Sequence, residues 1–119
     1  MNFSKLSGSG NDFIFLDARE YSPQQFDPVR ITDLCARGSG IGADGLCFLG
    51  PGASRGAVRL VYFNADGSRG ALCGNATLCA TILAGTWDLC KDRGFAIETD
   101  SGPVRVAAAE DGTSVTMEA

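Results

Sequence analysis

The segment from Asn75 to Trp87 constrains the fold most strongly, because it predicts a helix that carries no charged side chain. Its apolar residues cover nearly every face of such a helix: Ala76, Leu78, Cys79, Ala80, Ile82, Leu83 and Ala84. A helix that is apolar all round belongs in the interior of a protein. We therefore expect this helix to be buried inside the domain.

Shorter patterns in the rest of the chain predict a β-rich domain. Nine of the sixteen glycines gather in short stretches that indicate turns, at 8–10, 38–45 and 50–56. Compact or alternating apolar runs predict strands at 13–16, 58–63, 95–99 and 104–108, and the final residues, 116–119, fit one more strand.

A second helix is predicted to begin at Asp27, a good N-cap residue that is followed by Pro28. Apolar residues then recur at helical spacing through Cys35, and Gly38 ends the pattern. We expect this helix to be amphipathic and to lie on the surface.

Length and charge exclude several classes of protein. A chain of 119 residues, 45% of them apolar and 20% charged, has the size and composition of one globular domain. Its net charge of −4 and its scattered basic residues predict no nucleic-acid partner. We also expect no membrane association and a cytoplasmic location, because no apolar run approaches about 18 residues and the first residues lack the order of a signal peptide.

The cysteines give no sign of a metal site or a disulfide framework. The chain has five cysteines, no C-x-x-C pair and no histidine, so we expect no bound metal. Most such thiols are small buried groups that serve packing alone. Only a cysteine in a special setting is a candidate for chemistry.

Cys73 has such a setting, because Gly74 and Asn75 follow it at the start of the predicted buried helix. The first N–H groups of a helix have no intrahelical acceptor and carry the positive end of the macrodipole, so they can bind a carboxylate. Gly74 would let a ligand approach the backbone closely. The same field lowers the pKa of a thiol below its free value of about 8.5. The alternative is an ordinary turn and cap with a buried cysteine.

Asn11, Asn64 and Asn75 are candidates for binding an amino acid. Neutral amides can hold both an ammonium and a carboxylate group without competing to protonate either one. Asparagine in a glycine-rich turn is, however, as often a turn former. The pattern alone leaves both interpretations open for Asn11 and Asn64.

Four blocks of the sequence, in this order, closely resemble the first half of diaminopimelate epimerases: Phe3–Phe13, Gly40–Leu46, Phe63–Ser68 and Cys73–Asn75. The resemblance implies a pyridoxal-independent enzyme without a cofactor that interconverts LL- and meso-diaminopimelate for lysine and cell-wall synthesis. It also implies that Cys73 is the first of two catalytic cysteines. In the same way it implies that Asn11, Asn64, Gly74 and Asn75 hold the amino and carboxylate groups of the substrate.

The resemblance implies an α+β fold, with two similar domains that are each a mostly antiparallel strand barrel wrapped around one buried central helix. Residues 1–119 correspond to the amino-terminal domain, and the carboxy-terminal domain is absent from this chain. A two-base racemisation needs an acid/base group on each face of the α-carbon. Cys79 lies on the same helix as Cys73 and is expected in the core. The expected partner is therefore a second epimerase domain or a second copy of this chain.

The chain also departs from the family pattern. Ser7 stands where the family usually has histidine, and Ala76, Thr77 and Leu78 stand where it usually has glycine and, soon after, arginine. This last order is partly similar to isomerases of the phenazine-biosynthesis type. The alternatives are an isomerase or racemase of the same fold that acts on another amino acid, and a catalytically silent half-domain that binds a small zwitterion or a partner protein. A redox-sensing Cys73 is a weaker alternative, because no resolving cysteine lies near it in a C-x-x-C pair.

Overall fold

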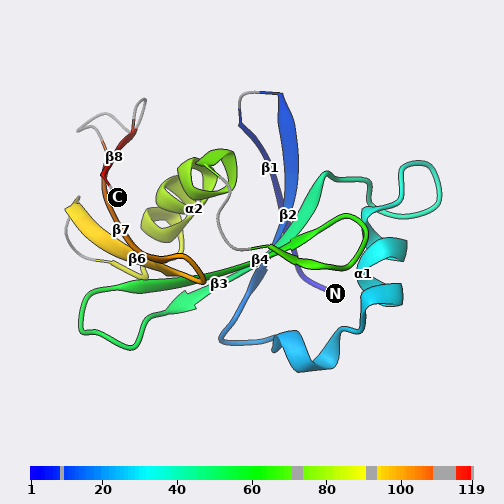
Figure 1. Ribbon diagram of the computed structural model, residues 1–119, viewed down its shortest axis with the longest axis horizontal. Coiled ribbons are helices and arrows are strands. Elements are labelled where there is room, and N and C mark those ends of the chain that lie inside the picture. The colour runs from blue at the N-terminus through cyan, green and yellow to red at the C-terminus, as the bar shows by residue number, and fades with distance from the viewer. Residues whose placement is uncertain (9, 71–73, 91–93, 109–114, 119) are drawn as a thin grey trace.

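The computed structural model describes residues 1–8, 10–70, 74–90, 94–108 and 115–118. These residues form one mixed sheet with two α-helices and a 3-10 helix (Figure 1). The strands are β1 (Ser4–Gly8), β2 (Asn11–Asp17), β3 (Gly45–Pro51), β4 (Val58–Asn64), β5 (Arg69–Gly70), β6 (Gly94–Thr99), β7 (Gly102–Ala108) and β8 (Val115–Glu118). The helices are η1 (Pro23–Gln25), α1 (Pro28–Cys35) and α2 (Gly74–Thr86).

The sheet has the strand order β1-β2-β3-β4-β6-β7-β8, and β5 pairs with the free part of β4. The pairs β2–β3 and β4–β6 are parallel, whereas the other pairs are antiparallel. An α+β domain with mostly antiparallel pairing is therefore confirmed. Among the described strands no ladder joins β1 to β8, so a closed barrel is not confirmed.

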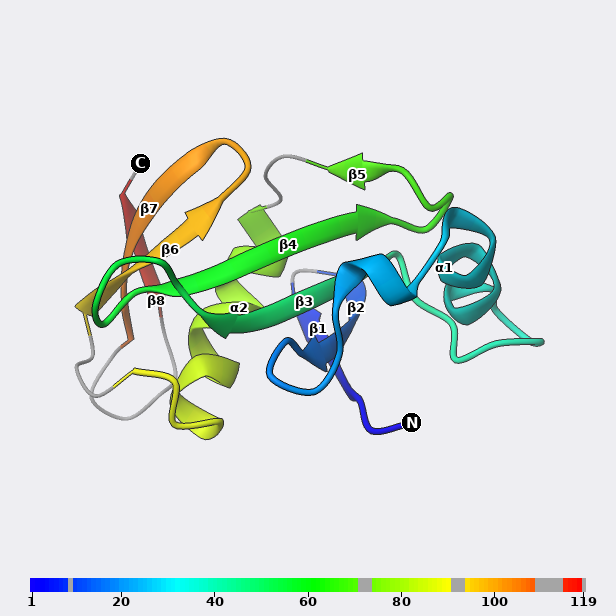
Figure 2. The same cartoon turned by 90° about the horizontal axis from the view of Figure 1, so that it is seen from below.

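Helix α2 lies in the concave side of the sheet, with β1 on one flank and β7 and β8 on the other (Figures 1 and 2). Its buried residues are Ala76, Thr77, Cys79, Ala80, Thr81, Leu83 and Ala84. The opposite side of the helix is open, and Ile82 is 47% exposed. The prediction of burial is thus correct for one side of α2 and is not confirmed for the other, because the sheet covers the helix from one side only.

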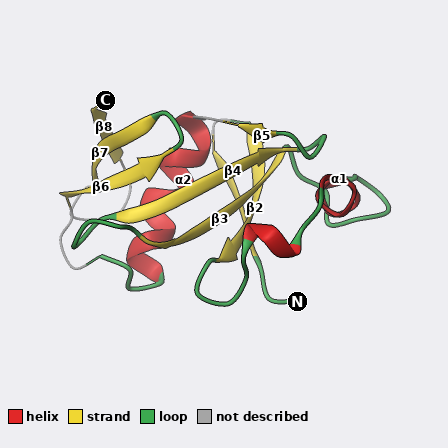
Figure 3. Ribbon diagram, turned by 60° about the horizontal axis from the view of Figure 1, so that its bottom comes forward, coloured by secondary structure: helices red, strands yellow, loops and turns green. Residues whose placement is uncertain are grey.

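Both faces of strands β2 and β3 are buried, which explains why these strands read as continuous apolar runs. Phe13 and Phe15 point to the α2 side, and Ile14 and Leu16 point to the side of α1. Figure 3 shows the two α-helices well separated, with β2, β3 and β4 between them. The sheet therefore separates two apolar clusters.

The sequence-predicted elements agree with the structure at α1, α2, β2, β4, β6, β7 and β8, although the strands extend by a few residues and position 119 lies outside the described part. The Asp27 carboxylate accepts a hydrogen bond from the Arg30 N–H at 2.8 Å, as expected of an N-cap. Strands β1, β3 and β5 were not predicted. Two glycines at the ends of its apolar run, Gly45 and Gly50, made β3 resemble a pair of turns.

Two further structural observations concern membrane-spanning helices and metal sites. Within the described residues, no helix has the length and apolar character needed to cross a membrane. The same part of the chain holds no group of three or more His, Cys, Asp or Glu side chains arranged to bind a metal ion.

Phe15→Ala is expected to lower the free energy of unfolding by about 3–5 kcal/mol, because the ring is fully buried between the sheet and α2 and its loss leaves a cavity. Val29→Ala is the matched surface control, since Val29 is 69% exposed, and it should change this free energy by less than about 0.5 kcal/mol. Urea unfolding followed by the fluorescence of the single tryptophan, Trp87, measures both values. Equal effects of the two variants would contradict the assigned core.

Candidate active site

The candidate site lies where the turn between β1 and β2 meets the first turn of α2. Gly8 ends β1 and Asn11 begins β2. A Cβ atom on Gly8 would lie 3.0 Å from Cys79 Sγ and 3.4 Å from the Asn75 carbonyl oxygen. Because Cys79 is buried, a side chain on Gly8 would require its sulfur to shift, so glycine favours this close approach of β1 to the helix.

The approach brings two of the sequence-predicted residues into direct contact. The Asn75 side-chain amide donates a hydrogen bond from Nδ2 to Oδ1 of Asn11, with a distance of 2.6 Å. Both side chains are half-buried, so each keeps a solvent-facing side. The start of α2 and the start of β2 are therefore joined by two neutral amides.

Asp44, just before β3, contacts this pair through Asn11. Its Oδ2 atom accepts hydrogen bonds from the Asp12 N–H at 2.9 Å and from Asn11 Nδ2 at 3.4 Å. In return, the Asp44 N–H donates to the Asp12 carbonyl oxygen at 2.9 Å. Asp44 is thus held to Asp12 both through its carboxylate and through its own main-chain N–H.

Arg37 links the two carboxylates of this network. Its guanidinium donates to Asp12 Oδ2 at 3.1 Å and to Asp44 Oδ1 at 3.3 Å. The Ser7 hydroxyl and then Arg37 lower the pKa of Asp12, and the Asp12 N–H, the Asn11 amide and Arg37 lower the pKa of Asp44. Both carboxylates therefore stay ionised at neutral pH. Because these groups are partly exposed, the ion pairs add little to stability, and their main effect is on orientation.

Asn64 lies at the same end of the sheet but does not reach the Asn11–Asn75 pair. Phe13 is opposite Gly45 in the ladder, and Gly45 is opposite Asn64, so Asn64 shares the α2 side of the sheet with Phe13. Its amide donates to the Ser68 hydroxyl at 3.1 Å, within the turn between β4 and β5. It could contact only a ligand long enough to extend across β3.

Gly74 is the exposed first residue of α2, and its neighbour in the sequence, Cys73, lies outside the described residues. The first N–H groups of α2 have no acceptor within the helix, and they lie beside two neutral amides. This arrangement can bind a carboxylate and an ammonium group together. The described site contributes no carboxylate that lacks a partner, so the ligand that it fits best is a zwitterion.

The described cysteines are placed as the sequence predicted. Cys35, Cys47 and Cys79 are buried, and Cys90 is half-buried. Burial raises the pKa of the Cys35 thiol, which keeps that group protonated at neutral pH. These positions indicate packing rather than acid/base chemistry.

Several residues of the site were missed by sequence reasoning, among them Asp44, Arg37 and Tyr62. Asp44 was part of the block Gly40–Leu46 but was not singled out. Tyr62 packs against the strands that carry the site: a Cβ atom on Gly45 or on Gly70 would lie 2.6 Å or 2.5 Å from its ring, which also packs edge-on against Phe13. The sequence signal for Tyr62 was a glycine on each of the two neighbouring strands, Gly45 on β3 and Gly70 on β5. This signal can be recognised only when the register of the strands is known.

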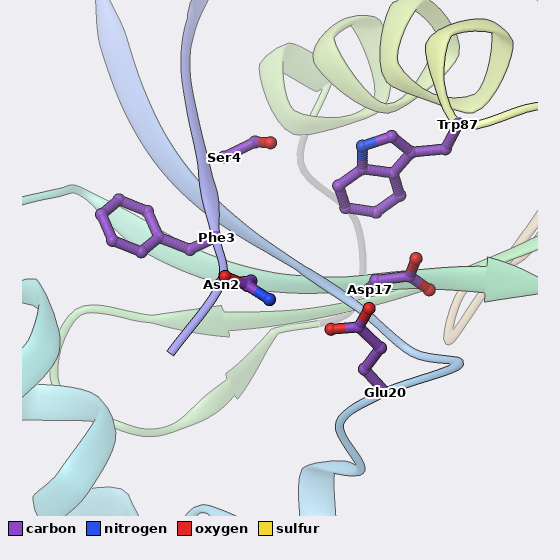
Figure 4. A pocket seen from close by; sticks show the side chains of 6 residues that line it. All are labelled: Asn2, Phe3, Ser4, Asp17, Glu20 and Trp87. Atoms are coloured by element: carbon purple, nitrogen blue, oxygen red, sulfur yellow. The ribbon is translucent and has the colours of Figure 1, made fainter.

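A cavity of about 160 Å³ lies at the other end of α2 (Figure 4). The carboxylates of Asp17 and Glu20 lie near each other on one side of it, across from the ring of Trp87. Asp17 is paired with Arg19, but the described residues that line this pocket include two carboxylates and no basic side chain, which makes it less suited to the carboxylate of an amino acid. The chemistry of a zwitterion therefore favours the Asn11–Asn75 end.

Comparison with solved structures defines the class of fold. The chain superposes on a hydroxyproline epimerase from Agrobacterium vitis with a TM-score of 0.72 at 16% identity, over 97% of this chain and 40% of that one. It also superposes on a phenazine biosynthesis protein from Bacillus anthracis with a TM-score of 0.64 at 17% identity, over 97% of this chain and 37% of that one. The domain therefore has the fold shared by these epimerases and phenazine biosynthesis proteins.

Sequence comparison is more specific. The sequence model described as diaminopimelate epimerase matches residues 3–119. The diaminopimelate epimerase of Gemmatimonas aurantiaca is 43% identical over 104 residues, which are 86% of this chain and 37% of that protein. That of Methanothermobacter thermautotrophicus is 36% identical over 95% of this chain and 41% of its own length. The chain belongs to the diaminopimelate epimerase family. It spans about two fifths of the length of these relatives.

Gly8→Ala is expected to lower the free energy of unfolding by about 1–3 kcal/mol, because the added methyl group overlaps Cys79 Sγ in a packed region. Removing the sulfur with Cys79→Ala in the Gly8→Ala background should recover part of this loss. Gly85→Ala is the control: nothing lies within 4 Å of its Cβ position on α2, so alanine should stabilise by about 0.5–1 kcal/mol. Equal signs for Gly8→Ala and Gly85→Ala in urea unfolding would contradict the tight approach of β1 to α2.

Proposed function

We propose that the chain is the amino-terminal half of a cofactor-independent diaminopimelate epimerase, which interconverts LL- and meso-diaminopimelate in lysine biosynthesis in the cytoplasm. The observation that carries this proposal is the Asn75–Asn11 hydrogen bond at the start of α2. It joins two sequence blocks, 64 residues apart, that the family resemblance assigns to substrate binding.

In this proposal the helix and the amides hold the amino-acid group of the substrate. The N–H groups of Gly74 and Asn75 receive the α-carboxylate, because they have no acceptor within the helix and lie at the positive end of α2. The amide oxygens of Asn75 and Asn11 receive the α-ammonium group. Asn64, two strands from β2, contacts a more distant part of the long substrate.

Cys73 is the proposed acid/base residue on one face of the α-carbon. As a thiolate it takes the α-proton, so that the C–H bond breaks and an S–H bond forms. The electron pair left on the substrate delocalises into the carboxylate, where the N–H groups of α2 stabilise the added charge. A thiol on the opposite face then returns a proton to the carbon. The proton count balances without a cofactor.

The second thiol is proposed to come from a second domain. We further propose that the whole protein has the family fold, in which a strand barrel encloses the central helix and two such domains face each other. Its support is the sheet that already curves around α2, and the greater length of the relatives. A second copy of this chain is the alternative source of the opposing group, and sedimentation as a monomer would exclude it.

A racemase or isomerase of the same fold that acts on another amino acid is the second candidate. One specific observation favours it: Ser7, which replaces the usual histidine, donates a hydrogen bond to Asp12 at 2.5 Å and so belongs to the network behind the site. A change at this position alters the surroundings of Asn11. A catalytically silent half-domain that binds a zwitterion or a partner protein is the third candidate.

The exchange of the α-hydrogen of LL-diaminopimelate in heavy water, detected by mass, tests the proposal. The chain is assayed alone and with the carboxy-terminal part of the Gemmatimonas aurantiaca relative added. Cys73→Ala should reduce exchange at least about 100-fold, because it removes the acid/base group. Cys90→Ala, a half-buried thiol, is the control and should leave exchange within about twofold of the parent.

Three outcomes separate the candidates. Exchange that depends on Cys73 supports the epimerase. Exchange of proline or another amino acid in preference to diaminopimelate supports the second candidate. Binding of the amino acid without exchange, under both conditions, supports the silent half-domain and contradicts the role proposed for Cys73.

A further inference from the structure

Asn11 and Asn75 both have a side-chain amide that can adopt two orientations, and a binding site built from them depends on which orientation each one takes. The two ends of an asparagine amide have nearly the same shape, but one end is a donor and the other is an acceptor. A rotation of half a turn therefore reverses what the site offers to a ligand. Something has to select one orientation if the pair is to recognise an ammonium and a carboxylate reliably.

Asp44 supplies this selection for Asn11. An ionised carboxylate only accepts hydrogen bonds, so its Oδ2 atom requires the NH2 end of Asn11, at 3.4 Å. A reversed Asn11 would place its own Oδ1 against a negative oxygen. With the NH2 end held by Asp44, Oδ1 of Asn11 is left for Asn75, from which it accepts at 2.6 Å.

Asn75 is thereby oriented as well. Because its Nδ2 donates to Asn11, its Oδ1 atom is left on the other side of the amide, where it accepts no hydrogen bond from the described residues. An acceptor is thus placed beside the donors at the start of α2. An acceptor next to a set of N–H donors matches the adjacent ammonium and carboxylate groups of an α-amino acid.

The Asp44 carboxylate, which orients Asn11 and through it Asn75, is itself held in place by several hydrogen bonds. Asp44 exchanges hydrogen bonds with the backbone of Asp12 and accepts from Arg37. The residue before it is fixed too, since the Ala43 N–H donates to the Cys35 carbonyl oxygen at 3.0 Å. The Arg37 side chain is 57% exposed, so water can replace its hydrogen bond to Asp44 more easily than it can replace the backbone hydrogen bonds of Asp44.

We propose that Asp44 is a positioning residue, which through Asn11 holds the Asn75 amide with its oxygen free to accept the substrate's ammonium group. This inference rests on the proposed function for the identity of the ligand. The orientation itself does not depend on that function, and it can be measured without ligand.

Asp44→Asn tests the proposal, because it keeps the size of the side chain but can present either a donor or an acceptor to Asn11. Loss of one charge-assisted hydrogen bond predicts a Kd for LL-diaminopimelate about tenfold higher. In an active form, KM should rise by a similar factor while kcat changes less than about threefold. Asp17→Asn is the matched control: Asp17 lies at the other end of β2 and also accepts from an arginine side chain and a backbone N–H. It should leave Kd and KM within about twofold of the parent.

A double-mutant cycle separates positioning from simple loss of stability. If Asp44 acts through Asn11, then Asp44→Asn should raise Kd less than about twofold in the Asn11→Ala background. An equal increase in both backgrounds would overturn the proposal.

The ligand-free side-chain NH2 signals of Asn11 and Asn75 in nitrogen-15 NMR spectra give the second readout. The chemical shifts of these signals should change in Asp44→Asn and stay the same in Asp17→Asn. Unchanged signals in Asp44→Asn would overturn the proposal even if LL-diaminopimelate binds. Changed signals in a chain that exchanges no α-hydrogen, either alone or with the carboxy-terminal part of the relative added, would support the positioning role and refute the epimerase activity.

Discussion

The packing of α2 against the concave side of the sheet is the interaction on which the other features of the site depend. Its buried small side chains let the helix lie close to the strands, and Gly8 lets β1 approach within contact of Cys79. This contact fixes the first turn of α2 beside the start of β2. The N–H groups of a helix terminus are common, but here their position relative to a strand end is set by a tightly packed core.

The charges around the site follow a simple order. The amides of Asn11 and Asn75 are hydrogen-bonded to each other, and the ionised Asp12, Asp44 and Arg37 form a network that meets the other end of the Asn11 amide. The neutral amides can bind both charges of a zwitterion, whereas the ionised groups satisfy one another. The low pKa of Asp44 matters here, because a protonated carboxyl group could donate as well as accept and would no longer select one amide orientation.

Local patterns predicted both α-helices and the strands β2, β4, β6, β7 and β8, and the family resemblance named Asn11, Asn64 and Asn75. The contact between Asn75 and Asn11 could not be predicted from spacing, because it requires the register of a sheet and the docking of a helix. Asp44 was missed for the same reason, since its partners Asn11 and Asp12 precede it by more than thirty residues. The open side of α2 was missed because an apolar sequence indicates that a helix is buried but not by what. Cys73 stays a prediction, since it lies outside the described residues.

A crystal structure of the protein with meso-diaminopimelate is the most direct test of where the substrate binds. The account predicts that one α-carboxylate lies about 2.7–3.2 Å from the N–H groups of Gly74 and Asn75, with the ammonium group at the Asn75 amide oxygen. It also predicts that Asn75 still donates to Asn11. A ligand that binds instead beside Trp87 and Asp17, or an amino-acid group that contacts neither the start of α2 nor the two asparagines, would contradict the account.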